Sequence, residues 1–146
     1  MIEPVLVPFK AEHWMRFVQL GATYESEFRG AIAKEQGGPA FTAILEDQIL
    51  ACAGIIVHHQ GMGYAWSILS SLSKGYPIWM TRTIKYMIRD VKRGLNLHRL
   101  ELIVDANELM HQRWAEKLGF VLERDGRARM FLPDKGDVIR YEMVDK

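Results

Sequence analysis

The sequence predicts a mixed α+β fold in a single domain. The chain has 146 residues, an ordinary length for one domain, and 49% apolar with 25% charged residues is typical of folded globular proteins. Segments with strand-like patterns alternate with segments whose apolar residues recur at helical spacing. The predicted order is a strand, two helices, three strands, a helix, a strand, a helix and then two or three strands.

The chain opens with a predicted strand and two predicted helices. Residues 2–8 form the strand, and Pro4 and Pro8 restrict it to a sheet edge, because proline lacks the N–H group that a ladder needs. Apolar side chains recur on one face of residues 11–20 and of residues 24–34, which predicts two amphipathic helices. Their charged residues are therefore expected on the outer faces.

A hairpin is predicted next. The breaker at residues 37–39, Gly-Gly-Pro, precedes two strand-like runs at residues 41–46 and 49–58, which only two residues separate. The second run is continuously apolar, so we expect it in the centre of the sheet with both faces covered. Its Cys52 is the one cysteine of the chain, which excludes an internal disulfide, and we expect it to be a core residue.

A strand at residues 64–69, a loop at residues 70–77 and a helix at residues 78–93 are predicted after the hairpin. The proline that ends the loop fits the first helical turn, where its missing N–H group costs nothing. The apolar stripe expected to face the core consists of Met80, Ile84, Met87, Ile88, Val91 and Leu95. We interpret the basic residues of this helix as a solvated face, with Arg82 and Lys85 near any nucleotide phosphate that binds at the loop.

The stretch at residues 97–120 predicts a strand, a turn, a helix and the entry to another strand. An alternating run of leucine, isoleucine and valine predicts a strand buried on both faces. Asp105 and Asn107 can cap the helix, and Glu108 follows Asp105 at the spacing of a capping box. Gly119 allows the left-handed stop. The expected apolar stripe of this helix is Leu109, Met110, Trp114 and Leu118.

The end of the chain predicts a second hairpin and a last strand. Asp125 and Gly126 are a strong two-residue turn signal between strand-like runs at residues 121–124 and 127–132. Residues 138–143 form the last strand, and its free edge is a candidate for pairing with another copy of the chain.

The run Asn107, Trp114, Ala115, Glu116, Lys117, Leu118, Gly119 and Phe120 resembles the N…YEKLGF signature of the GNAT superfamily of acyl-CoA-dependent N-acyltransferases. The order of predicted elements also resembles that of the family from end to end. The resemblance implies a GNAT-like central twisted, mostly antiparallel sheet of about six to seven strands flanked by about four helices. It also implies that the protein transfers an acetyl group from acetyl-CoA to a primary amine.

The resemblance places acetyl-CoA at the strand and loop before the long helix. In the family, backbone groups of this strand pair with the pantetheine arm, and N–H groups of a glycine-rich loop at the helix N-terminus bind the pyrophosphate. The residues implied to bind the cofactor here are Ile68, Leu69, Ser70, Ser71, Ser73, Lys74, Gly75, Tyr76, Asn107 and Trp114.

This loop departs from the family pattern. Leu72 replaces the Gln or Arg, only the central glycine, Gly75, is kept, and Pro77 removes one donor N–H group. Lys74 and the hydroxyls of Ser71 and Ser73 compensate in part. We therefore expect phosphate binding to be weakened.

The catalytic residues implied by the resemblance are His111 and Glu25. Trp114 stands where many members have the tyrosine that protonates the departing thiolate, and an indole N–H group does not release a proton near neutral pH. His111 shares the expected helix face of Asn107 and Trp114, and it is either an acid or base or a structural histidine. Asn107 either binds the pantetheine or caps the helix. Glu25 and Glu27 either contact the amine or form a solvated face.

These departures resemble a narrower subgroup, the GNAT-like proteins of tailed bacteriophages. There a Trp-containing strand precedes an irregular, glycine-poor loop, and a Trp precedes LGF. Residues 65–70 and 113–120 carry the match here. The alternative function that it implies is a catalytically inactive virion, ejection or interaction protein.

Charge and hydropathy restrict the partners. The net charge of +1 gives no global attraction to nucleic acid or a membrane surface, and no apolar run is long enough to span a bilayer. We expect an amine-bearing small molecule or protein substrate, no specific nucleic acid, and either a homodimer or a virion partner. The expected location is cytoplasmic, or the host cytoplasm or virion for a phage protein. His58 and His59 point to opposite faces of a strand, so no metal site is expected.

Overall fold

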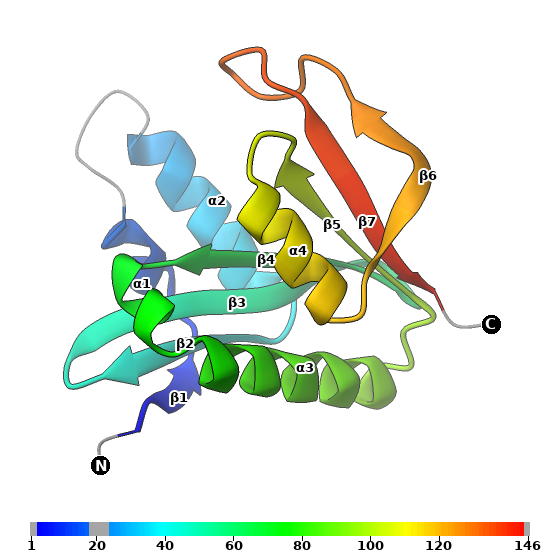
Figure 1. Cartoon of the computed structure of the whole chain (residues 1–146). Coiled ribbons are helices and arrows are strands. Elements are labelled where there is room, and N and C mark those ends of the chain that lie inside the picture. The colour runs from blue at the N-terminus through cyan, green and yellow to red at the C-terminus, as the bar shows by residue number, and fades with distance from the viewer. Residues whose placement is uncertain (1–2, 18–23, 145–146) are drawn as a thin grey trace. The chain divides into compact units, whose positions relative to one another are not determined.

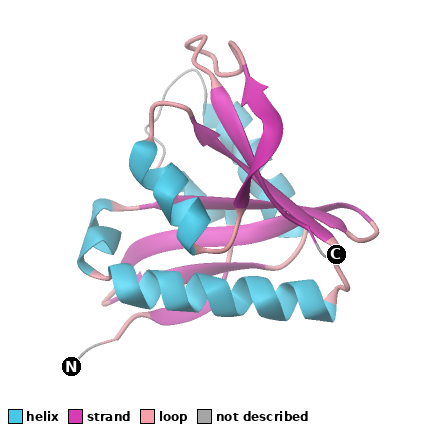
Figure 2. Ribbon diagram, turned by 45° about the vertical axis from the view of Figure 1, so that its right-hand side comes forward, coloured by secondary structure: helices cyan, strands magenta, loops and turns pink. Residues whose placement is uncertain are grey.

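The computed structural model of the protein describes residues 3–17 and 24–144, without the side chains of residues 24–26. It confirms the mixed α+β class (Figure 1 and Figure 2). The described elements are β1 (Val5–Pro8), α1 (Ala11–Met15), α2 (Tyr24–Gln36), β2 (Ala40–Leu45), β3 (Gln48–His59), β4 (Met62–Leu69), the 3₁₀ helix η1 (Ser71–Gly75), α3 (Pro77–Gly94), β5 (Arg99–Asp105), α4 (Leu109–Lys117), β6 (Val121–Ala128) and β7 (Val138–Val144).

The described strands form one mostly antiparallel sheet in the order β1-β2-β3-β4-β5-β7-β6. Antiparallel registers join β1 to β2, β2 to β3, β5 to β7 and β6 to β7, whereas β4 and β5 are parallel. Because β7 has a strand on each side, the free edge predicted at residues 138–143 is wrong. The described edge strands are β1 and β6.

The chain divides into two compact units that share three elements. The first unit comprises Met1–Val57 and Ala65–Met80, and the second comprises His58–Tyr64 and Thr81–Lys146. β3, β4 and α3 each begin in one unit and end in the other. The prediction of a single domain is not tested by this division and stays a prediction.

In the first unit, the predicted hairpin of β2 and β3 is confirmed. Its two turn residues, Glu46 and Asp47, have φ angles of 49° and 68°, the left-handed pair that matches the twist of two-residue hairpins. Cys52 is fully buried, which confirms it as a core residue. The first helix, predicted at residues 11–20, ends at Met15. Residues 18–20 of that prediction lie outside the described residues.

In the second unit, the hairpin predicted at Asp125 and Gly126 is wrong. Both residues lie inside β6, which pairs with β7 on either side of an irregularity between Leu122 and Arg127. Asp125 has a φ of 58°, so these two residues bend the strand as a bulge and do not reverse it. The sequence signal was a real local turn tendency, but both flanking runs pair with one partner strand.

The cap and the apolar stripe predicted for α4 are partly wrong. The helix begins at Leu109 after Glu108, and no side-chain hydrogen bond caps it. Asp105 lies in β5, and its carboxylate accepts the N–H group of Asn107 at 2.9 Å within the preceding turn. The buried residues on this segment are Ala115, Leu118 and Phe120, whereas Leu109 and Met110 are 61% and 74% exposed. The left-handed stop at Gly119, with a φ of 104°, is confirmed.

The long helix α3 begins at Pro77, as its residue type suggests. Of its predicted apolar stripe, Met80 and Ile88 are buried, whereas Leu95 lies after the helix and is 44% exposed. Within the described residues, no helix is both long and apolar enough to cross a membrane.

Candidate active site

The strand β4 leaves its parallel neighbour early. Among the described residues, the ladder with β5 joins Met62 to Arg99, Gly63 to Leu100 and Tyr64 to Glu101. β4 itself continues to Leu69, beyond this ladder. The N–H and C=O groups on that edge at residues 65–69 are therefore not used by β5, and an extended ligand can pair with them as an added strand would.

The segment after β4 is a short helix and not the predicted loop. In η1, the backbone N–H group and the hydroxyl of Ser73 both donate to the carbonyl oxygen of Ser70, at 3.1 and 2.7 Å. Such local serine bonds favour a tight turn. Ser73 is 7% exposed, and its hydroxyl is used in a bond within η1. The part predicted for Ser73 in holding a phosphate is not tested and stays a prediction.

The start of α3 offers the anion site of a helix N-terminus. Pro77 has no N–H group, and the N–H group of Met80 donates to the carbonyl oxygen of Tyr76 at 2.9 Å. The N–H groups of Ile78 and Trp79 belong to the first turn, where helix geometry leaves donors without intrahelical acceptors and the helix dipole favours negative charge. The first unit thus holds an open strand edge followed by a helix start.

The loop residues proposed for the cofactor differ in exposure. Ser71, Lys74 and Gly75 are exposed, and Gly75 has room for a side chain, since a Cβ atom there would meet nothing within 4 Å. The hydroxyl of Ser70 is buried, and it has no hydrogen-bond partner among the described residues. An unpaired buried hydroxyl costs roughly 1–3 kcal/mol, so this junction of β4 and η1 is where a ligand or water would supply a partner.

An aromatic cluster that the sequence analysis missed lies on the first half of the chain. Trp66 of β4 packs edge-on against Phe9 and Trp14, with ring centroids 4.9 and 5.7 Å away. The Nζ atom of Lys34 lies 4.4 Å from the centroid of the Trp14 ring, and desolvation lowers the pKa of this amine. Glu27 accepts the indole N–H group of Trp14 at 3.0 Å. These residues lie in α1, α2 and β4 and, for Phe9, just after β1, so no local sequence pattern predicts that they meet.

Among the described residues, no hydrogen bond or ion pair joins the predicted catalytic residues, Asn107 or Trp114 to the segment of β4, η1 and the first turn of α3. Glu25 lies in the first turn of α2, and its side chain is outside the description. Asn107 and His111 are exposed residues of the second unit. Asn107 precedes α4, so the prediction that it shares a helix face with His111 and Trp114 is wrong. The Trp114 indole donates to the hydroxyl of Thr81 at 3.1 Å.

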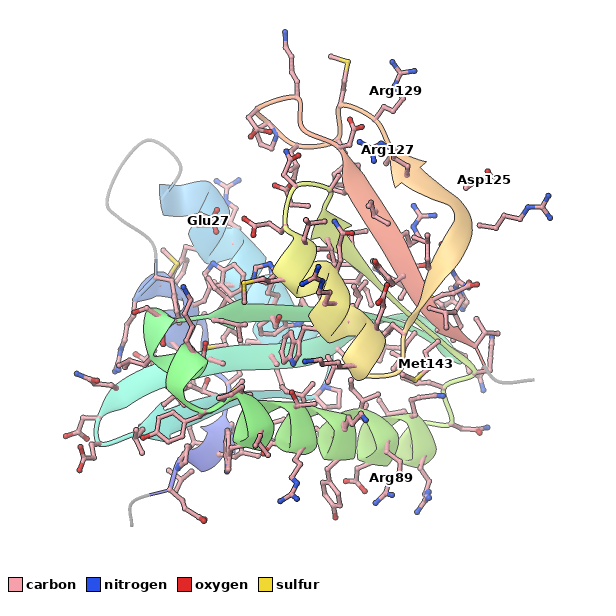
Figure 3. All side chains as sticks on the ribbon, viewed as in Figure 1. Glu27, Arg89, Asp125, Arg127, Arg129 and Met143 are labelled. Carbon is pink, nitrogen blue, oxygen red and sulfur yellow. The ribbon has the colours of Figure 1, made fainter. Side chains whose placement is uncertain are left out.

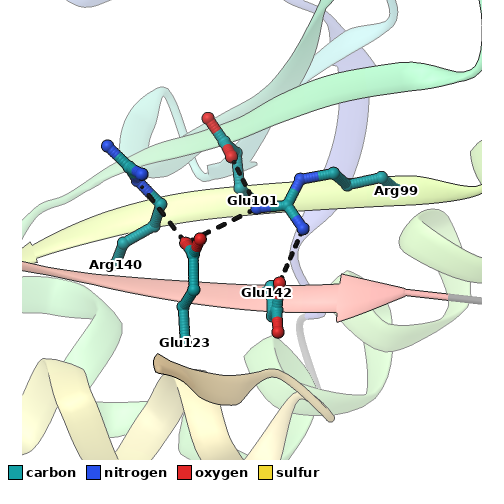
Figure 4. A network of polar contacts seen from close by, with 5 residues as sticks. All are labelled: Arg99, Glu101, Glu123, Arg140 and Glu142. Carbon is teal, nitrogen blue, oxygen red and sulfur yellow. Dashed lines mark hydrogen bonds and ion pairs between the residues drawn. The ribbon is translucent and has the colours of Figure 1, made fainter. Parts of the chain in front are cut away.

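A charged network lies on the strands of the second unit (Figure 4). The guanidinium of Arg99 lies 2.6 Å from Glu142, 3.0 Å from Glu101 and 3.5 Å from Glu123. The hydrogen bond to Glu142, the largest cause, raises the pKa of Arg99, and Arg140 places a second cation 3.7 Å from Glu123. Burial and, second, the negative charge of Glu101 raise the pKa of Tyr64.

No protein-family model matches the chain, and no curated protein does either. Solved structures do match. The ribosomal-protein-S5-alanine acetyltransferase of Vibrio fischeri aligns over 97% of this chain and 92% of its own, at 16% identity and a TM-score of 0.74. An acetyltransferase of the GNAT family from Streptococcus pneumoniae aligns over 98% and 100%, at 14% identity and a TM-score of 0.72.

The chain has the GNAT acetyltransferase fold. RimL, a ribosomal L7/L12 alpha-N-protein acetyltransferase solved in complex with coenzyme A, also aligns over 95% of this chain and 92% of its own, at 13% identity and a TM-score of 0.72. The fold implied by the sequence resemblance is thus confirmed over nearly the whole chain. Identities this low show the fold alone.

Proposed function

We propose that the protein is an acetyl-CoA-dependent N-acetyltransferase that acts on a primary amine. The observation that carries the proposal is the edge of β4 at residues 65–69, which β5 does not use and which η1 connects to the helix start at Pro77. An extended thioester arm fits such an edge, and a diphosphate fits a helix N-terminus. The likeness to coenzyme A-binding acetyltransferases supports this.

In this proposal the chain binds and orients two substrates. The pantetheine arm pairs with Ile68 and Leu69 of β4, and the pyrophosphate lies against Ser71, Lys74 and Gly75 with Ser70 and Tyr76 beside them. The neutral amine attacks the thioester carbonyl carbon, the C–S bond breaks, and the amine loses its proton. Positioning the two reactants supplies much of the rate acceleration, which a chain with Trp114 in place of an acidic tyrosine still provides. We assign Glu25 as the base that takes the amine proton, and His111 as the acid that protonates the thiolate.

The first experiment is a thermal-shift titration with acetyl-CoA, with free CoA alongside. Ligand at about 100 times its dissociation constant should stabilise the folded state by about 2.7 kcal/mol, which raises Tm by roughly 5 to 10 °C in a domain of this size. The absence of any shift at millimolar acetyl-CoA contradicts the proposal. A panel of amines, including a peptide with an N-terminal alanine, a lysine peptide and a polyamine, then identifies the acceptor by release of free CoA.

A matched pair of variants localises the binding. Gly75→Asp places a carboxylate where the pyrophosphate is proposed to lie, and the affinity should fall roughly tenfold or more. Gly94→Asp makes the same change at the end of α3, where a Cβ atom likewise meets nothing within 4 Å. This control should bind acetyl-CoA as the unmodified protein does. Equal loss in both variants would place the binding elsewhere.

A second candidate function is that of a catalytically inactive GNAT-fold protein, such as a phage virion or ejection protein or another interaction protein. The departures at the loop favour this candidate, since Pro77 lacks an N–H donor and the N–H group and hydroxyl of Ser73 both donate to the carbonyl oxygen of Ser70. This candidate predicts a flat thermal-shift titration together with a stable fold.

A further inference from the structure

The exposed side of α3 is basic from Arg82 to Arg93. Arg82, Lys85, Tyr86, Arg89 and Arg93 recur at intervals of three, one, three and four residues, so they form one stripe along the helix, which we call the basic face. All five are exposed, and Tyr86 is 61% exposed. Figure 3 shows Arg89 pointing away from the helix. All five belong to the second unit.

The charge of the chain is separated between this helix and the rest. α3 carries five basic residues and one acidic residue, whereas the remainder of the chain carries fourteen basic and seventeen acidic residues. The net charge of +1 therefore conceals a strongly positive helix on an otherwise slightly acidic protein. A positive stripe attracts polyanions locally even where the whole molecule is nearly neutral.

Like charges follow one another along the basic face. Lys85 with Arg89, and Arg89 with Arg93, are like charges at i,i+4, a spacing at which equal charges repel. The one acidic residue of α3, Asp90, lies to the side of the stripe. An anionic partner lying along the stripe would neutralise the repulsion between these like charges.

An exposed aromatic ring lies in the middle of the basic face. The guanidinium carbon of Arg89 is 5.5 Å from the centroid of the Tyr86 ring. A flat ring next to cations is the combination with which proteins bind single-stranded nucleic acid, because bases stack on the ring while the cations follow the phosphates. The stripe from Arg82 to Arg93 is about 16 Å long at a rise of about 1.5 Å per residue, which is the axial span of roughly five phosphates of one strand in a duplex.

We propose that the basic face of α3 binds single-stranded nucleic acid without sequence preference. The proposal is independent of the acetyltransferase activity. A membrane surface fits less well, because a helix that inserts into lipid needs a free apolar side, and the apolar side of α3 is packed inside the protein at Met80 and Ile88. It also refines the expectation of no specific nucleic acid, since stacking and phosphate contacts read no sequence.

Fluorescence polarisation with labelled oligo(U) RNA and oligo(dT) DNA of the same length tests the proposal. Four neutralised phosphates give a slope of about −3 in log affinity against log salt, or roughly a fiftyfold loss from 50 to 200 mM salt. Binding of either oligonucleotide supports the proposal, and the tighter of the two identifies the natural strand. No binding of either at 20 mM salt overturns it.

Variants separate the basic face from general charge. Lys85→Glu with Arg89→Glu should weaken binding more than tenfold. The helix should stay folded, because positions 85 and 89 keep one like-charge pair while positions 89 and 93 become an opposite-charge pair at i,i+4. Tyr86→Ala should weaken binding about fivefold or more with an unchanged salt slope. The control, Arg124→Glu with Arg129→Glu, makes the same charge change at exposed residues outside α3 and should lose less than threefold. Equal losses of affinity in both charge variants would contradict the proposal. Polyglutamate is a second control: if it binds as tightly as the oligonucleotides and Tyr86→Ala has no effect, the face binds any polyanion and the proposal of nucleic acid binding is wrong.

Discussion

At the scale of single residues, His13 has its proton placement fixed by the backbone. The N–H group of Lys10 donates to Nδ1 of His13 at 3.1 Å, so this nitrogen carries no proton. The hydroxyl of Thr42 lies 2.8 Å from the same nitrogen, and it donates to the Sγ atom of Cys52 at 3.6 Å. Protonation of Nδ1 would break the bond from the N–H group of Lys10. Burial, the largest cause, and the nearby charge of Arg16 lower the pKa of His13 in the folded protein.

This arrangement predicts acid sensitivity. Because the folded pKa of His13 lies below the unfolded value of about 6.5, the unfolded chain takes up the proton first, and the free energy of unfolding falls as the pH drops below that value. The stability is fully present above it. Urea unfolding at pH 7.5, 6.5 and 5.5 measures the decline. His13→Asn keeps an acceptor oxygen and should flatten the decline, whereas His111→Asn, at an exposed histidine, should leave it unchanged. An identical pH profile for His13→Asn and the unmodified protein would contradict the argument.

Residue-scale reasoning from the sequence worked where a residue's own chemistry decided its place. Cys52 in an apolar run is buried, and burial raises its thiol pKa to about 11. It failed where distant partners decide. Nothing near Lys34 in the sequence points to the Trp14 ring, and nothing near Trp114 points to Thr81, since these contacts exist only once the elements have packed.

At the scale of elements, the bulge in β6 shows how the same local signal serves two structures. Asp125 and Gly126 favour positive φ angles and so predict a hairpin turn, yet the chain uses them to bend a strand that pairs with β7 on both sides. A hydrophobic pattern does not reveal which strand will be the partner. The predicted start of α4 was wrong for a related reason. The Asp105 carboxylate that was expected to cap the helix accepts the N–H group of Asn107 in the turn before it.

The bulge makes a prediction about glycine. A Cβ atom on Gly126 would lie 2.9 Å from the carbonyl oxygens of Arg140 and Glu123, both of them backbone atoms that cannot turn away. Gly126→Ala should therefore destabilise the fold by roughly 1–3 kcal/mol. Gly75→Ala is the matched control, because its Cβ atom meets nothing within 4 Å, and it should be neutral or stabilise by up to about 1 kcal/mol. Urea unfolding of the pair decides, and equal stabilities would show that β6 relaxes freely.

At the scale of the whole molecule, the order of elements was predictable because each element has its own periodicity and its own breakers. The network on Arg99 was not, because its carboxylates come from β5, β6 and β7, and only the strand order brings them together. The same holds for the candidate site. The sequence indicated the strand, the segment of η1 and the helix start. It did not indicate that the hydroxyl of Ser73 donates to Ser70 within η1, or that the ladder between β4 and β5 ends at Tyr64.

The sharing of elements between the two units predicts one cooperative unfolding transition. β3, β4 and α3 each run from one unit into the other, so neither unit can unfold without breaking three elements of its neighbour. Native-state hydrogen exchange should therefore give the amides of Leu50, in the first unit, and Leu100, in the second, opening free energies that agree within about 1 kcal/mol, both equal to the global stability. Both residues are fully buried, so each reports on its own unit's core. If one amide exchanges through an opening roughly 2 kcal/mol or more below the other, the units unfold separately and the prediction of a single domain is wrong.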